Sequence, residues 1–176
     1  MSIRVAGDHL IVLLMGDPEA AFFRASIGTF PGRKFRQAQT VGALRRHLST
    51  GPERVRIISF CSRVIVPPDL IAKYAGQCFN FHPGPPEYPG FRPSRFAVEE
   101  GVSEFGVTFH TMVEDVDAGP IHEVRRFTVP PGTSRAELDA LTFAELAKLA
   151  HALAPRLGNL HCRFALSGEQ WGTRPQ

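Results

Sequence analysis

The chain has 176 residues, of which 43% are hydrophobic and 21% charged, and its formal net charge is +3. These values are typical of an ordinary globular protein, and the length predicts one domain over residues 1–176. The basic residues are dispersed, and the longest apolar run near the N-terminus, Leu10 to Met15, is too short to span a membrane, so we expect a cytoplasmic protein that binds neither nucleic acid nor a membrane.

Apolar strand-like runs alternate with helical patterns in the first half of the chain, which favours a parallel α/β sheet. Thr40 is the expected N-cap of the second helix, because its hydroxyl can accept a hydrogen bond from the first helical turn. Residues 28–36 contain glycine and proline and are predicted to form a loop. The predicted strands cover residues 10–15, 55–61 and 78–82, and the predicted helices cover residues 18–25, 41–48 and 68–74.

The second half contains a proline-rich segment, two further strands and a long helix. Residues 83–93 hold five prolines and two glycines, and we predict a loop there because proline can continue neither a strand nor a helix. Ser134 and Glu137 form a capping-box pattern that opens the long helix, and the tail from residue 158 is not assigned. We predict a helix over residues 94–100, strands over 105–113 and 121–129, and an apolar face of the long helix made of Phe143, Leu146, Ala147, Ala150, Leu153 and Leu157.

Three polar residues near predicted strand ends have the chemistry of a catalytic site. Asn80 and His82 are two residues apart, so their side chains point to the same face of an extended strand. Asp117 comes just before a Gly-Pro pair that would end a strand or open a loop. An amide, an imidazole and a carboxylate are the minimum set for moving an acyl group between amines. A strand end with a surface histidine explains the same spacing equally well, so both interpretations stay open at this point.

Five short segments surround these residues: Tyr74-Ala75-Gly76, Asn80-Phe81-His82-Pro83, Tyr88-Pro89-Gly90, Gly106-Val107-Thr108-Phe109-His110 and Val116-Asp117-Ala118-Gly119-Pro120-Ile121. In this order and spacing they resemble the folate-dependent formyltransferases, over about residues 55–131. That family includes glycinamide ribonucleotide transformylase, sugar-amine N-formyltransferases and the N-terminal domain of methionyl-tRNA formyltransferase. The resemblance implies a Rossmann-like α/β fold, with a mostly parallel twisted sheet flanked by helices.

The resemblance also implies roles for individual residues. Asn80 and His82 match the family residues that address the formyl oxygen and the tetrahedral intermediate. Asp117 matches the aspartate that orients the histidine and organises the water that transfers the proton. Thr108 and His110 share a strand face and are expected to lie in the second layer around these three side chains, as the family counterpart of His110 does. Packing at a strand end is the alternative interpretation of His110.

The donor implied by the resemblance is 10-formyltetrahydrofolate, and the implied reaction uses no metal. The pterin ring of the donor is expected to bind the backbone of two loops. The first loop contains Arg63, Val64 and Ile65, and the second contains Val113, Glu114 and Asp115.

Two departures from the family pattern bear on the acceptor. The segment after His82 and Pro83 is one residue shorter than the usual Ser-Leu-Leu-Pro. The first predicted strand is followed by Asp17, Pro18 and Glu19 in place of a phosphate-binding loop, and the two carboxylates would repel a phosphate. We therefore expect no ribonucleotide acceptor. Initiator tRNA is not expected either, because no tRNA-binding domain fits after the long helix.

The sequence thus predicts an enzyme that transfers the formyl group of 10-formyltetrahydrofolate to an amine of a small-molecule acceptor. Two alternatives stay open. One is a hydrolase that releases formate from the same donor. The other is a folate-binding or formyl-handling module without amine transfer, similar to domains of hydrogenase maturation proteins. The oligomeric state is also open, a homodimer included.

Overall fold

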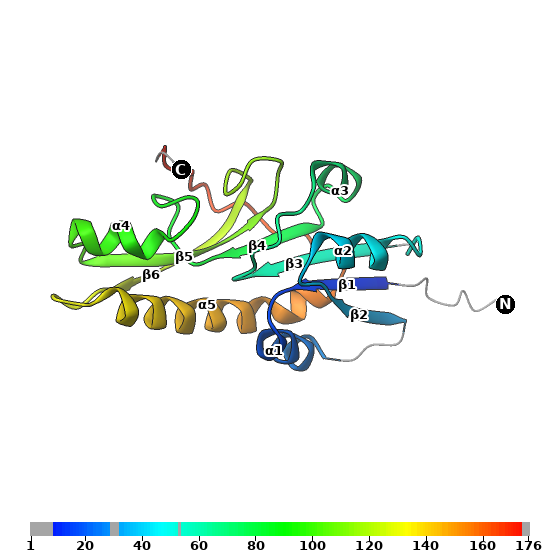
Figure 1. Cartoon of the computed structure of the whole chain (residues 1–176), viewed down its shortest axis with the longest axis horizontal. Coiled ribbons are helices and arrows are strands. Elements are labelled where there is room, and N and C mark those ends of the chain that lie inside the picture. The colour runs from blue at the N-terminus through cyan, green and yellow to red at the C-terminus, as the bar shows by residue number, and fades with distance from the viewer. Residues whose placement is uncertain (1–8, 29–31, 53, 174–176) are drawn as a thin grey trace. The chain divides into compact units, whose positions relative to one another are not determined.

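The computed structural model describes residues 9–28, 32–52 and 54–173, and in these ranges the strands form one six-stranded sheet of order β2-β1-β3-β4-β5-β6. This is the α/β fold that the sequence predicts, with a mostly parallel sheet and flanking helices. The elements in chain order are β1 (His9–Leu14), α1 (Asp17–Ile27), β2 (Arg33–Gln37), α2 (Val41–Leu48), β3 (Arg54–Phe60), α3 (Pro68–Lys73), β4 (Cys78–His82), α4 (Pro93–Glu100), β5 (Glu104–Thr111), β6 (Ile121–Thr128) and α5 (Arg135–Gly158) (Figure 1).

The contacts within the chain form two compact units. The first comprises residues 1–79 and 151–163, and the second comprises residues 80–150 and 164–176. Each unit is described by itself below, and the single-domain organisation expected from the sequence stays a prediction.

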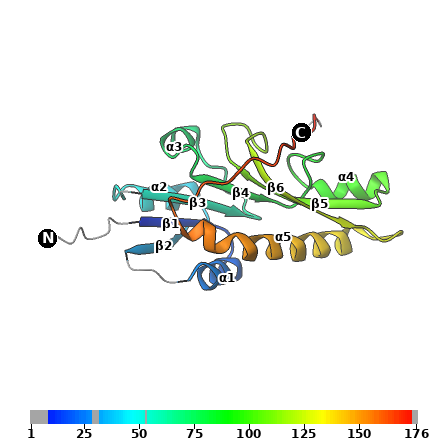
Figure 2. The same ribbon diagram turned by 180° about the vertical axis from the view of Figure 1, so that it is seen from behind.

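In the first unit, β1 pairs in parallel with β2 on one side and with β3 on the other. Leu10 to Leu14 are all buried, as is typical of a central strand covered on both faces. Helices α1 and α2 lie on opposite sides of these strands (Figures 1 and 2). The connections β1 to β2 and β2 to β3 run in opposite directions, and right-handed crossovers then place the helices on opposite faces.

The prediction of a loop over residues 28–36 is wrong for residues 33–36, which belong to β2. This strand lies at the edge of the sheet, and its exposed positions are Lys34 and Arg36. Charged residues suit an edge strand, but they conceal it from an analysis of apolar patterns. The strand forms because its backbone pairs with β1, a partner that lies outside the segment itself. Residues 29–31 of the predicted loop lie outside the described residues.

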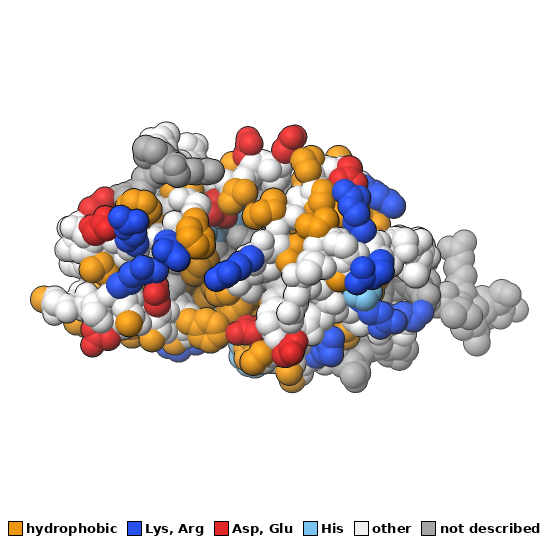
Figure 3. Space-filling model, viewed as in Figure 1, with side chains coloured by type: hydrophobic (Ala, Val, Ile, Leu, Met, Phe, Trp, Pro, Cys, Tyr) orange, Lys and Arg blue, Asp and Glu red, His pale blue; other side chains and the backbone are white. Residues whose placement is uncertain are grey.

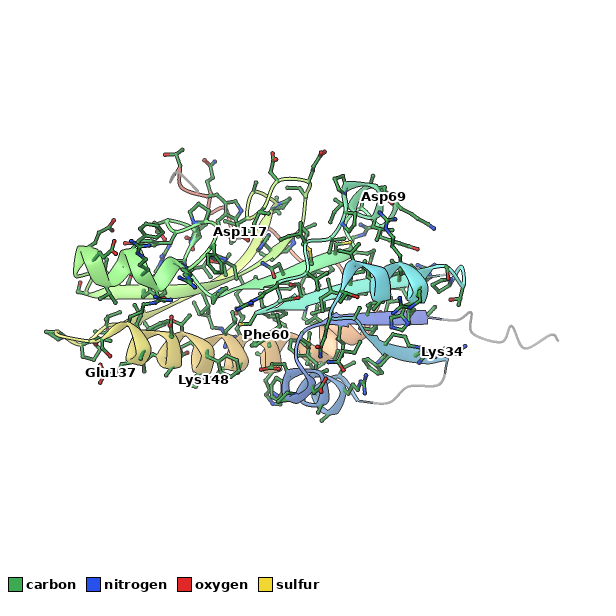
Figure 4. All side chains as sticks on the ribbon, in the orientation of Figure 1. Lys34, Phe60, Asp69, Asp117, Glu137 and Lys148 are labelled. Atoms are coloured by element: carbon green, nitrogen blue, oxygen red, sulfur yellow. The ribbon has the colours of Figure 1, made fainter. Side chains whose placement is uncertain are left out.

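The predicted helix starts are confirmed by their capping hydrogen bonds. The Ala43 backbone N–H donates to Thr40 Oγ1 over 3.1 Å at the start of α2. At the start of α5, the Ser134 backbone N–H donates to Glu137 Oε2 over 2.8 Å, and the Glu137 N–H lies 3.4 Å from Ser134 Oγ. Figure 4 labels Glu137 in this first turn.

The apolar face predicted for α5 is wrong at Phe143, and Ala147 is only half-buried. Leu146, Ala150, Leu153 and Leu157 are buried as predicted, but Phe143 is 45% exposed. Thr142 is buried in its place, four residues before Leu146. One residue corresponds to a turn of about 100° around a helix, so the phenylalanine falls outside the buried stripe.

In the second unit, β5 and β6 form an antiparallel pair with a register shift between Phe109 and His110. Such a bulge changes the direction in which the next side chain points, and bulges are common beside active sites. All residues from Phe105 to His110 are buried. The core of this unit includes Tyr88, Ala97, Phe105, Val129 and Leu138.

An unexpected feature of the first unit is a wholly buried arginine, Arg56 on β3. Its guanidinium donates to Gln77 Oε1 from Nη2 over 2.9 Å. It also donates to the Leu157 and Asn159 carbonyls over 3.0 Å each and to the Cys162 carbonyl over 3.1 Å. The last carbonyls of a helix lack partners within the helix, so Arg56 caps the end of α5. Burial lowers the pKa of Arg56 to about 10, which leaves it charged at neutral pH.

We predict that Arg56→Met lowers the free energy of unfolding by about 3 kcal/mol, because several buried carbonyls lose their donor at once. Urea unfolding followed by circular dichroism at 222 nm measures the change. Arg54→Met, at an exposed position of the same strand, is the matched control and should change the stability by less than about 0.5 kcal/mol. Equal stabilities of the two variants would contradict this role of Arg56.

Candidate active site

Three segments of the second unit bring polar side chains around one carboxylate. Asn80 and His82 lie at the end of β4, and His110 lies near the end of β5. Asp117 lies in the loop that joins β5 to β6, where Figure 4 labels it. Its backbone φ of 46° is in the left-handed region, which lets the chain turn sharply and direct the carboxylate inward. Asp117 is only 7% exposed.

Both oxygens of the Asp117 carboxylate have two partners. Oδ2 lies 3.1 Å from His82 Nδ1 and accepts a 2.8 Å hydrogen bond from the Gly90 backbone N–H. Oδ1 lies 3.2 Å from His110 Nε2 and 3.4 Å from Asn80 Nδ2. The carboxylate therefore holds β4, β5 and the loop 83–92 in one arrangement.

These partners also decide the charge of Asp117. Burial by itself raises the pKa of the Asp117 carboxyl, because it removes the charged form from water. Hydrogen bonds from His110 and His82, together with their charge, outweigh burial and hold the pKa of this carboxyl below its ordinary value. Asp117 is thus ionised at neutral pH.

The ring of His82 lies between two acceptors. Nδ1 faces the Asp117 carboxylate, and Nε2 lies 2.9 Å from the Tyr88 carbonyl oxygen. Neither partner can donate, so both ring nitrogens must carry a proton for both contacts to be hydrogen bonds. The ring is therefore held at both ends, with Nδ1 against the buried Asp117 carboxylate and Nε2 against a backbone carbonyl.

The loop after His82 is packed closely against the ring. A Cβ atom added to Gly84 would lie 2.8 Å from His82 Nε2 and 2.8 Å from Pro93 Cβ, so this position has room only for glycine. Thr108 Oγ1, which is buried, donates to the Gly84 carbonyl over 2.8 Å. Thr108 therefore holds this loop, while it is His110 that contacts the carboxylate.

His110 connects the amide to the carboxylate. Its Nε2 lies 3.2 Å from Asn80 Nδ2 as well as 3.2 Å from Asp117 Oδ1, and its Nδ1 lies 3.0 Å from the Thr111 carbonyl. The ring is 2% exposed and cannot turn without losing these contacts. His110 thus lies against the amide group of Asn80, which is half-buried.

The residues predicted to bind the pterin ring lie in two loops. Arg63, Val64 and Ile65 follow β3 in the first unit, where the Val64 N–H donates to Ser62 Oγ over 3.1 Å and Ile65 is 59% exposed. Val113, Glu114 and Asp115 lie in the exposed loop between β5 and β6 in the second unit. The role of all six in donor binding stays a prediction.

Within the described ranges, no group of three or more His, Cys, Asp or Glu side chains is arranged to hold a metal ion. No helix in the described part of the chain is both long and apolar enough to cross a membrane. The expectations of a metal-free reaction and of a cytoplasmic location stay predictions.

Three contributors to the site are not predicted from the sequence: the Tyr88 carbonyl, the Gly90 N–H and the side chain of Trp171. Tyr88 and Gly90 belong to a recognised motif, so their backbone roles had a signal, although it did not show which groups they contact. Trp171 had no signal, because it stands in a tail without helix or strand periodicity.

The chain is similar in sequence to known formyltransferases. A family model described as Formyl transferase matches residues 26–153. Phosphoribosylglycinamide formyltransferase of Escherichia coli strain K12 is 34% identical over 77 residues, which cover 43% of this chain and 36% of that protein. Methionyl-tRNA formyltransferase of Sorangium cellulosum is 31% identical over 134 residues, which cover 67% of this chain and 40% of that protein. The chain thus spans less than half the length of either relative.

Solved structures with the same fold have lower sequence identity. A 4-N formyltransferase from Francisella tularensis is 17% identical with a TM-score of 0.70, covering 90% of this chain and 72% of that one. The formyltransferase PseJ from Anoxybacillus kamchatkensis, in complex with UDP-4,6-dideoxy-4-formamido-L-AltNAc and tetrahydrofolate, is 21% identical with a TM-score of 0.68, covering 93% and 84%. A formyltetrahydrofolate deformylase from Pseudomonas syringae is 18% identical with a TM-score of 0.65, covering 83% and 58%.

The lowered pKa of Asp117 predicts a pH dependence of stability. The unfolded carboxyl binds a proton at a higher pH than the folded one, so the free energy of unfolding should fall as the pH drops below about 5. Asp117→Asn removes the titrating carboxyl. The free energy of unfolding should then decline less steeply between about pH 5 and pH 2. Urea unfolding at a series of pH values measures this dependence of the free energy of unfolding on pH.

The matched control for this prediction is Asp115→Asn, which removes an exposed carboxylate from the same loop. A decline in Asp117→Asn as steep as in the wild type would show that the buried carboxylate does not link stability to pH.

Proposed function

The chain belongs to the formyl transferase family, and on that basis we propose that it transfers the formyl group of 10-formyltetrahydrofolate to an amine of a small-molecule acceptor. The observation that carries the proposal is the cluster of Asn80, His82 and Asp117, in which the buried carboxylate has four partners: Asn80, His82, His110 and the Gly90 N–H. The resemblance to the family motifs assigns these three residues to the formyl oxygen and the proton transfer, which supports the proposal. The PseJ complex, which contains tetrahydrofolate and a formamido sugar, supports a folate donor and an amine acceptor.

The geometry suits the chemistry of this reaction. The amine nitrogen attacks the formyl carbon, and the formyl oxygen takes up negative charge. The Asn80 amide can donate to that oxygen, and His82 lies at the same strand end, where its ring stabilises the negative charge when it carries a second proton. The contacts to Asp117 and to the Tyr88 carbonyl hold the His82 ring at this strand end before the reaction, and such preorganisation makes charge stabilisation effective.

The second half of the reaction needs a proton transfer. The bond between the formyl carbon and the folate nitrogen breaks, the folate nitrogen takes up a proton, and the attacking amine loses one. We assign this transfer to His82, with Asp117 holding the ring in place and stabilising its charged form. These residues suit a formyl group as substrate, because the formyl oxygen needs a donor such as the Asn80 amide and the leaving nitrogen needs a proton carrier such as the His82 imidazole.

The first turn of α1 supports an acceptor other than a ribonucleotide phosphate. Asp17 and Glu19 lie in this turn, and Pro18 removes one backbone donor. A Cβ atom added to Gly16 would lie 2.5 Å from Glu19 Oε2, so the Glu19 carboxylate lies directly over the helix start. The carboxylates of Asp17 and Glu19 would therefore repel an anion such as a phosphate at this end of α1.

The distribution of charge supports a small molecule over a nucleic acid as the acceptor. On the face seen in Figure 3, Lys and Arg side chains lie in separate groups among acidic and apolar ones. A nucleic-acid surface usually shows a continuous basic patch or stripe.

A hydrolase is the second candidate function, favoured by the likeness to the Pseudomonas syringae deformylase. The same three residues would serve, with water in place of the amine. Purified protein incubated with 10-formyltetrahydrofolate alone separates the two functions. A transferase should release tetrahydrofolate only when an amine is added, whereas a hydrolase should release formate and tetrahydrofolate in equal amounts without one. Donor binding in calorimetry without turnover under either condition would instead favour a formyl-handling module.

We predict that Asn80→Ala, His82→Ala and Asp117→Ala each lower the rate of tetrahydrofolate release by at least about 100-fold, since each removes charge stabilisation or proton transfer. Absorbance of the released folate measures the rate, and circular dichroism checks the fold. Lys148→Ala, at an exposed position of α5, is the control and should keep the wild-type rate. Wild-type rates in all three site variants would refute the assignment.

A further inference from the structure

The C-terminal segment, residues 164–173, returns to the site and binds three parts of it. The Ser167 backbone N–H donates to the Ile121 carbonyl over 3.0 Å at the start of β6. The Trp171 Nε1–H donates to the Gly119 carbonyl over 2.8 Å, two residues after Asp117. The Gly172 N–H donates to the Pro86 carbonyl over 2.9 Å in the loop after His82. The segment thus touches the loops on both sides of the carboxylate.

A charged cluster strengthens this attachment. The Arg126 guanidinium on β6 lies 3.0 Å from Glu87 Oε1, in the loop after His82, and 2.5 Å from Glu169 Oε2, in the C-terminal segment. Glu87 and Glu169 together raise the pKa of Arg126 despite its partial burial. A Cβ atom added to Gly172 would lie 3.2 Å from the Glu87 backbone, so the segment and the loop are in close contact.

Trp171 is the residue of this segment that reaches the histidines. Its ring centroid lies 5.5 Å from that of His82 at an interplanar angle of 80°, and 4.9 Å from that of His110 at 82°. Perpendicular packing at these distances is favourable for aromatic rings, and more so when one of them is a cation. The indole packs against both rings, and its N–H bond to the Gly119 carbonyl holds it in this position.

We propose that Trp171 is a positioning residue for the reaction, so that the C-terminal segment completes the active site. The indole holds the His82 and His110 rings against Asp117 and covers them on one side. It acts on the substrate only through the histidines and is not itself a catalytic residue. This inference rests on the proposed function for its kinetic consequences, but the arrangement of the rings can be tested without activity.

The test compares Trp171→Ala with Trp171→Phe. The alanine variant removes the ring and should lower kcat at least about tenfold, with the KM for 10-formyltetrahydrofolate changed less than about threefold, because misplaced catalytic groups affect the chemical step. Its dependence of kcat on pH should also shift, because the environment of the histidines changes. The phenylalanine variant keeps a ring against both histidines and should recover most of kcat. Leu166→Ala, at a position of the same segment that is 70% exposed, is the control and should match the wild type.

The second readout is the nitrogen and proton resonances of the histidine rings, assigned with His82→Ala and His110→Ala. Both sets should shift in Trp171→Ala and stay close to the wild type in Trp171→Phe. Unchanged histidine resonances and wild-type kcat in Trp171→Ala would overturn the inference while leaving the formyl-transfer proposal intact. If the wild type lacks formyl transfer altogether, the proposed function fails, and the resonances still decide whether Trp171 positions the rings. Should Trp171→Ala not fold, wild-type kcat and resonances in Trp171→Leu would overturn the inference in the same way.

Discussion

The buried carboxylate of Asp117 is the interaction on which the site in the second unit depends. Removing an ionised carboxylate from water costs several kcal/mol unless it is paired and hydrogen-bonded. Here the compensation comes from His82, His110, Asn80 and the Gly90 backbone. One charge therefore holds the end of β4, the end of β5 and the loop after His82 together, and the arrangement that stabilises the fold is also the one that orients the imidazole.

The first unit contains a second buried charge with a comparable structural effect. Arg56 on β3 donates to the carbonyls at the end of α5 and just beyond it. Helix ends expose carbonyls that must find donors, and a guanidinium with five N–H groups can serve several of them. The roles of the two charged groups differ. The partners of Arg56 are backbone carbonyls and a glutamine, so its role is structural, whereas the partners of Asp117 include side chains that can take part in catalysis.

Much of the fold could be predicted from local patterns. β1, β3 and β4 are apolar runs, and the start of α2 follows from the cap of Thr40, because burial and capping leave a signal in the neighbouring residues. β2 could not be predicted, because an edge strand of charged residues owes its form to pairing with β1. The apolar face of α5 was misplaced at Phe143, since which side of a helix is covered depends on its neighbours.

The sequence by itself determined the class of fold, the family, and the residue types that the proposed chemistry requires, since these are carried by short motifs in a recognisable order. Only the tertiary structure decided how these residues are held. The Tyr88 carbonyl, the Gly90 N–H and the Trp171 indole reach the site through backbone geometry or from a distant segment. Backbone groups are the same in every residue, and contacts between distant segments leave no periodicity, so a motif that contains Tyr88 and Gly90 does not show which groups they contact, and the contact of Trp171 leaves no pattern at all.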